Sequence, residues 1–138
     1  MPSSRQLLDT NVLVRFFSGE PPDLAEKARR LIERADAGQL TLVVVPVILA
    51  ETFFTLESYY DINRKVVAEK LARFLNCQGI QALEKDLLLE ALLRCQEKNA
   101  HFADAYLAAC AAQSGEPIAS FDRDFDKLGD VKRIEPRA

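Results

Sequence analysis

The chain has little of what the commonest catalytic sites need. Its 138 residues include one histidine, three cysteines and five glycines. A Ser-His-Asp or Cys-His triad would have to use His101, and neither G-x-S-x-G nor H-E-x-x-H occurs. The phosphate-binding patterns G-x-x-x-x-G-K-[ST] and G-x-G-x-x-G are missing as well. If the chain is an enzyme, carboxylates must therefore carry its chemistry.

The cysteines and the histidine do not suggest a disulfide framework or a zinc site. Cys77, Cys95 and Cys110 are odd in number and none belongs to a C-x-x-C pair. We expect Cys95 and Cys110 to be small buried hydrophobic side chains, because both lie in apolar helical patterns. His101 precedes Asp104 by three residues, so it either supports that carboxylate or simply begins a helix.

Long hydrophobic runs and an excess of positive charge are also missing. The longest apolar run, residues 42–50, contains Pro46 and is too short to span a bilayer. The first residues show no charged-then-apolar signal pattern, so we expect a cytoplasmic protein without membrane association. The formal net charge of −3 excludes a strongly basic nucleic-acid coat but leaves room for a local basic face.

Apolar stretches alternate between strand and helix patterns along the chain. This alternation predicts a parallel sheet covered by helices in a single domain. The expected strands are residues 6–8, 40–45, 80–83, 118–120 and 131–134. The expected helices are residues 12–17, 24–37, 46–60, 63–76, 86–98 and 103–114, and an acidic turn follows at 121–126.

Four carboxylates occupy places in this pattern where ligands gather. Asp9 ends the first strand and Asp122 follows the fourth, and ligands of open parallel sheets lie beyond such strand ends. Glu51 lies in the second turn of the helix after the second strand, and Asp104 lies in the first turn of the helix before the fourth. Helix capping could explain Asp9 or Asp104 alone, but it does not explain Glu51 inside its helix.

Converging carboxylates would repel one another. Two charges ~4 Å apart at an effective dielectric near 20 cost about 4 kcal/mol, so either some groups are protonated or a cation binds. Oxygen-only ligands suit Mg²⁺ or Mn²⁺ better than zinc. One such ion, or a pair, could activate water for an in-line displacement at phosphorus.

The segments that hold these acids resemble the ordered acidic motifs of the PIN domain family. They are LLDTNVL around Asp9, AE ending at Glu51, FADAYLAA around Asp104 and SFDRDF around Asp122. The resemblance is greatest to small VapC-type toxin ribonucleases of toxin–antitoxin pairs, and it spans roughly residues 7–134. It implies a three-layer α/β/α fold over one domain, residues 1–138, with parallel strand order 3-2-1-4-5 and helices on both faces.

The same resemblance implies Mg²⁺- or Mn²⁺-dependent endonucleolytic cleavage of RNA. The metal-binding and catalytic residues would be Asp9, Glu51, Asp104 and Asp122. Supporting residues would be Thr10, Asn11, Ser120 and Asp124, where Ser120 stands in place of a threonine common in the family. Whether Asp122 or Asp124 is the fourth ligand stays open, because both follow the fourth strand.

The partners implied are an RNA substrate, a cognate VapB-like antitoxin and a second copy in a homodimer. Basic residues should flank the acidic groove and contact phosphates. Arg15 and Arg123 are the nearest to acidic motifs in the sequence, and Arg64 is among the other basic residues considered.

Other functions are also considered. A catalytically inactive PIN-like binding module would keep the fold without cutting RNA. A receiver-type phosphoacceptor would need paired acids after the first strand, and a phosphohydrolase would need Asp-x-Asp there. Thr10 and Asn11 follow Asp9 instead, which disfavours both.

Overall fold

The computed structural model describes residues 4–137. Its main sheet has three parallel strands, β1 (Ser4–Leu7), β2 (Leu40–Val44) and β3 (Ile80–Ala82), with β2 in the centre. Four of the five β2 residues are buried, as expected for a β-branched, apolar strand with neighbours on both edges. The predicted α/β class with parallel pairing is confirmed.

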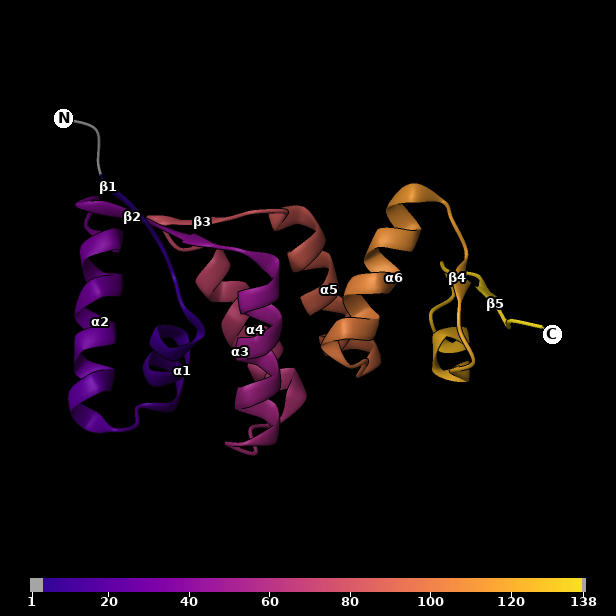
Figure 1. Ribbon diagram of the computed structural model, residues 1–138, viewed down its shortest axis with the longest axis horizontal. Helices are drawn as coiled ribbons and strands as arrows, with labels where there is room; N and C mark the ends of the chain where they lie inside the picture. Colours follow the sequence, from indigo (N-terminus) through magenta and orange to yellow (C-terminus); the bar gives the residue numbers. More distant parts are fainter. Residues whose placement is uncertain (1–3, 138) are drawn as a thin grey trace.

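Six α-helices accompany the strands within the described residues (Figure 1). They are α1 (Thr10–Ser18), α2 (Pro22–Asp36), α3 (Pro46–Ser58), α4 (Arg64–Leu75), α5 (Lys85–Lys98) and α6 (Phe102–Ser114). Pro22 and Pro46 each occupy the first helical position, where a missing amide hydrogen is harmless. The elements lie where they were expected, but some of their ends differ. The first strand ends one residue before the expected 6–8 segment does, the last strand is shorter than 131–134, and α1 begins two residues early and includes Thr10 and Asn11.

The last strands form a second sheet of their own. β4 (Ile118–Ala119) pairs in parallel with β5 (Arg133–Ile134), and the 3₁₀ helix η1 (Arg123–Lys127) lies between them in the chain. The predicted neighbours 3-2-1 and 4-5 are therefore confirmed. The expected pairing of the first strand with the fourth is wrong for the chain as described in residues 4–137, because the sheet is divided there.

Helices lie between the two sheets. In Figure 1, β4 and β5 lie at one end of the molecule and β1 at the other, with α3, α4 and α5 between them. The main hydrophobic core joins the three-stranded sheet to the helices and extends to the start of α6 at Phe102 and Ala105. A separate second core joins α6 to the C-terminal segment and consists of Ala108, Ala111, Ile118, Phe125 and Leu128.

A buried arginine fixes the C-terminal segment to α5. The Arg94 guanidinium donates to both carboxylate oxygens of Asp130, at 2.8 and 2.5 Å, and only 9% of its side chain is exposed. Hydrogen bonding from Arg94 holds the pKa of Asp130 below its ordinary value. A depressed carboxyl pKa means that this pair stabilises the fold above the unfolded-state pKa. The contribution is then lost as the pH falls through the folded-state pKa.

The first prediction concerns this pair. A double-mutant cycle of Arg94→Met and Asp130→Asn at neutral pH should give a coupling free energy of about 0.5–1 kcal/mol, modest because 56% of the Asp130 side chain is exposed. Urea unfolding measures it. The coupling should fade once the pH drops below the folded pKa of Asp130, and a coupling unchanged in acid would contradict the assignment.

The cysteines follow the expectation only in part. Cys95 is fully buried, and burial raises the pKa of its thiol to about 12. Cys110 is half-buried and Cys77 is exposed, and all three thiols are free. Cys95 thus acts as a small core side chain.

Candidate active site

Asp9 lies at the junction of β1 and α1. It occupies the N-cap position of α1 in extended geometry, but its side chain makes no capping hydrogen bond within the described residues. The carboxylate is exposed, so capping does not account for it. The next residue, Thr10, is buried, and its hydroxyl has no hydrogen-bond partner among residues 4–137. A buried hydroxyl without a partner beside a free carboxylate indicates a site rather than a structural cap.

Glu51 lies in the second turn of α3 with its side chain exposed. It lines a hollow together with Phe54, His101 and Ala103, so α3 and the start of α6 form its walls. Phe53, the next residue along, faces the core and stacks on Phe102 with ring centroids 5.3 Å apart. This aromatic pair fixes the helix of Glu51 against the helix that carries Asp104.

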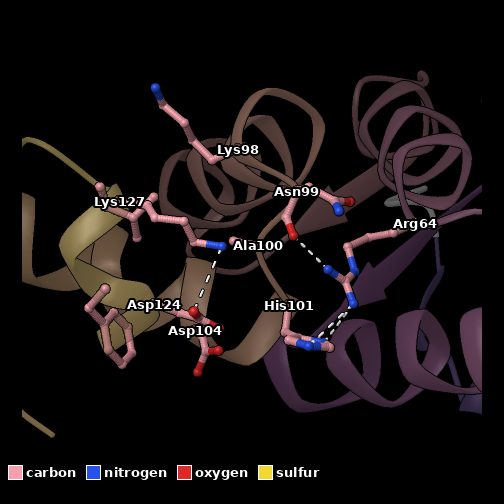
Figure 2. A pocket seen from close by; sticks show the side chains of 10 residues that line it. Arg64, Lys98, Asn99, Ala100, His101, Asp104, Asp124 and Lys127 are labelled. Atoms are coloured by element: carbon pink, nitrogen blue, oxygen red, sulfur yellow. Dashed lines mark hydrogen bonds and ion pairs between the residues drawn. The ribbon is translucent and has the colours of Figure 1, made fainter. Parts of the chain in front are cut away.

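Asp104 lies in the first turn of α6, where the helix dipole favours a negative charge. It lines a cavity of about 160 Å³ together with Asp124 and the cationic side chains of Arg64, Lys98 and Lys127 (Figure 2). Lys127 pairs with Asp124 at 3.9 Å. The ammonium of Lys127 thus lies beside the carboxylates, while that of Lys98 points away from them in Figure 2.

His101 connects the two hollows. It precedes α6 at the N-cap position, and its ring lines the hollows of both Glu51 and Asp104. The Arg64 guanidinium lies 2.8 Å from the Nδ1 of His101 and donates to the Asn99 carbonyl, as Figure 2 shows. It also donates to the Glu57 carboxylate. His101 is therefore held beside Asp104 by Arg64.

The structure separates the roles of the two acids after β4. Asp122 is the N-cap of η1, and its Oδ1 accepts a hydrogen bond from the Asp124 amide at 2.8 Å. Ser120 Oγ accepts one from the Asp122 amide at 2.9 Å. Asp122 therefore caps η1. Asp124 instead points its carboxylate into the cavity with Asp104.

The structure does not bring the four predicted carboxylates to one point. Asp104 shares its cavity with Asp124, Glu51 lines the neighbouring hollow, and Asp9 and Asp122 line neither. Within residues 4–137, no three His, Cys, Asp or Glu side chains form a group that could hold a metal ion. The oxygen donors of the four carboxylates suit Mg²⁺ or Mn²⁺. The quartet stays a prediction.

The basic residues near the acids differ from the two that the sequence favoured. Arg15 lines a separate, largely apolar hollow between α1 and α2 with Asn11, and it lies 3.4 Å from the Tyr60 hydroxyl. Arg123 is exposed on η1 and does not line the cavity of Asp104. Lys98 and Lys127 were missed. Lys98 lies three residues before His101, and Lys127 lies three residues after Asp124. This spacing was the signal in the sequence that could have identified both lysines.

Comparison with known proteins decides the family. The model of the PIN domain family matches residues 7–131, which is most of the chain. The chain belongs to the PIN domain family. It is also 30% identical to the VapC ribonuclease of Aquifex aeolicus (strain VF5) over 132 residues, which is 95% of this chain and 96% of that protein.

The residues that match the PIN family model include all the site residues described above. Asp9, Glu51, Asp104 and Asp122 all lie within the matched residues, as does the cavity of Asp104 and Asp124. The parallel strands and six helices are compatible with the three-layer α/β/α arrangement of a PIN domain. No helix within residues 4–137 combines the length and the apolarity needed to cross a membrane.

Proposed function

We propose that this PIN domain is an endoribonuclease, the toxin of a toxin–antitoxin pair, which hydrolyses RNA phosphodiester bonds with Mg²⁺ or Mn²⁺. The observation that carries the proposal is the match to a VapC ribonuclease over nearly the whole of both chains. The exposed carboxylate of Asp9, which makes no capping hydrogen bond within residues 4–137, supports it. An acid kept at a strand end without a structural task is typical of a catalytic position.

Four carboxylates would hold the ion: Asp9, Glu51, Asp104 and Asp122. When bound, a divalent ion supplies an acidified water and a positive charge for the phosphoryl oxygens. Thr10 and Asn11 would orient Asp9, and Ser120 holds the backbone of Asp122. Asp124, inside the cavity of Asp104, is the alternative fourth ligand.

Substrate binding is supported by the cations of the same cavity. Arg64, Lys98 and Lys127 line it beside Asp104, so positive charge lies within reach of the proposed reaction centre. Phosphate oxygens bind such side chains without regard to base sequence. We propose that these three, rather than Arg15 and Arg123, position the RNA backbone.

Removal of metal tests the proposed reaction. Purified chain should cleave single-stranded RNA oligonucleotides in Mn²⁺ or Mg²⁺, and excess EDTA should abolish the cleavage because the carboxylates alone provide no Lewis acid. Gel analysis of end-labelled RNA measures it, and added Mn²⁺ should restore the activity. Cleavage that persists in EDTA would contradict metal dependence.

A second function is favoured by one observation. Because no three acids of residues 4–137 assemble within one chain, a PIN-like module that binds RNA or a partner without cutting is the alternative. RNA retained in a filter-binding assay, with no cleavage in either metal, would support that alternative. A VapB-like antitoxin and a cytoplasmic location stay predictions.

A further inference from the structure

Arg64, the first residue of α4, binds three other segments of the chain with three different nitrogens. Its Nε donates to the Glu57 carboxylate of α3 at 2.7 Å, and its Nη1 donates to the Asn99 carbonyl at 2.5 Å. Its Nη2 lies 2.8 Å from Nδ1 of His101, and this ring nitrogen accepts because a guanidinium can only donate. Only 17% of the Arg64 side chain and 22% of the Glu57 side chain are exposed, so water competes little for these bonds.

The segment that Arg64 holds is the linker between α5 and α6. The linker consists of residues 99–101, because α5 ends at Lys98 and α6 begins at Phe102. Asn99 follows α5 with a φ of 53°, in the left-handed region that residues other than glycine adopt rarely. The hydrogen bond from Arg64 to the carbonyl of Asn99 supports this sharp turn (Figure 2). Arg64 therefore fixes the direction in which α6 begins.

The direction of α6 decides where Asp104 lies. Asp104 is in the first turn of α6, and the amide of the next residue, Ala105, donates to the His101 carbonyl at 2.8 Å. A shift of His101 is thus passed directly to the backbone around Asp104. The same guanidinium binds Glu57 of α3, and Glu51 lies six residues earlier in that helix. One side chain therefore joins the helix of Glu51 to the turn of Asp104.

We propose that Arg64 is a positioning residue for the proposed metal site, because it holds Asp104 at a fixed place relative to Glu51. The inference rests on the proposed ribonuclease function, in which both carboxylates are ligands. Residues that orient metal ligands commonly contribute about 10- to 100-fold to metal affinity. A contact of Arg64 with the RNA backbone is compatible with this role, because a guanidinium carries more N–H groups than the three engaged here.

The sign of the change in Mn²⁺ affinity tests the positioning role. Arg64→Met removes a positive charge beside a cation site, and that loss alone should strengthen manganese binding. If Arg64 positions Asp104, binding weakens instead, and we expect calorimetric titration to give an affinity about 10-fold lower. Arg64→Lys keeps the charge but not the planar fork that reaches three acceptors, so it should weaken binding as well. Equal or tighter binding by Arg64→Met would overturn the proposal.

Two control variants separate positioning from charge and from stability. Lys98→Met removes a positive charge from a residue that lines the same cavity and leaves the bonds of Arg64 in place, so it should bind Mn²⁺ at least as tightly as the wild type. Val67→Ala truncates a fully buried side chain three residues after Arg64 in α4. It should lower the midpoint of urea unfolding and leave manganese affinity unchanged. A 10-fold loss of affinity in either control would overturn the assignment.

Hydrogen exchange tests the structural step on the metal-free protein. The Ala105 amide reports on the start of α6, because it is buried and bonded to the His101 carbonyl. Arg64→Met should speed its exchange about 10-fold or more relative to the wild type, and well beyond any change in Val67→Ala. Nuclear magnetic resonance measures the exchange of this amide. An exchange rate that Arg64→Met leaves unchanged would mean that Arg64 does not fix the start of α6.

Steady-state kinetics separate positioning from a phosphate contact alone. Loss of a phosphate contact raises the KM for RNA and leaves kcat unchanged, which is the result expected of Lys98→Met. Arg64→Met should lower kcat about 10-fold even in saturating RNA and Mn²⁺, because Asp104 is displaced. A rise in KM with an unchanged kcat in Arg64→Met would overturn the positioning role and leave Arg64 as a phosphate contact.

Failure of this inference and failure of the proposed function give different results. A wild type that binds Mn²⁺ and cleaves RNA, beside an Arg64→Met variant that binds Mn²⁺ equally well, overturns the positioning role and leaves the ribonuclease function standing. A wild type that neither binds Mn²⁺ nor cleaves RNA overturns the proposed function and, with it, the role of Arg64 at a metal site.

Discussion

Replacing Asp9 by asparagine should reduce RNA cleavage about 100-fold or more, because one carboxylate ligand of the proposed metal site becomes a neutral amide. The change leaves the fold intact. Asp9 is exposed and makes no side-chain capping bond in the described structure, so its free energy of unfolding should change by less than about 0.5 kcal/mol. Cleavage rates in saturating Mn²⁺, together with urea unfolding, measure both expectations.

Asp23→Asn is the matched control for that experiment. Asp23 is likewise an exposed aspartate at the start of a helix, and it does not line the hollows of Glu51 or Asp104. Its replacement removes the same charge at a distance from the proposed site, and activity should be unchanged. Equal activity in wild type and Asp9→Asn would defeat the enzyme assignment, and equal losses in both variants would reduce the effect to net charge.

Phe53→Ala should lower the free energy of unfolding by about 3–5 kcal/mol, the range for a large buried aromatic side chain. Phe53 is 1% exposed and stacks on Phe102, with the two ring planes 25° apart. Truncation removes buried apolar area, leaves a cavity and loses the aromatic contact between α3 and α6. Urea unfolding monitored by circular dichroism measures the change.

The neighbouring phenylalanine provides the control. Phe54 is 67% exposed in the same helix turn, so Phe54→Ala should change stability by no more than about 0.5 kcal/mol. The two substitutions remove the same atoms at adjacent positions, and only burial differs. Similar costs for both would mean that the packing of α3 against α6 is not as described.

Local signals were enough to predict most of the elements. The β-branched run ending at Val44 predicted a buried strand, and Pro46 marked the start of the next helix, as observed. Gly115 ends α6 in the left-handed conformation that glycine adopts freely. Each of these features depends on neighbours within a few residues, and the sequence displays such neighbours directly.

Contacts between distant segments could not be predicted in this way. Nothing about Arg94 marks it as the partner of Asp130, 36 residues away, yet this pair holds the C-terminal segment against α5. The sequence correctly placed Asp9 and Asp122 after strand ends, Glu51 in the second turn of a helix and Asp104 in the first turn of another. Their convergence depends on whether β1 and β4 meet, which is a long-range pairing that no local pattern encodes.

Calorimetric titration with Mn²⁺ tests the central claim, that these carboxylates form one divalent metal site, most directly. Wild-type protein should take up manganese with a saturable heat, and Asp9→Asn should lose most of it while Asp23→Asn binds as the wild type does. Absence of binding to the wild type, or identical binding by wild type and Asp9→Asn, would contradict the account.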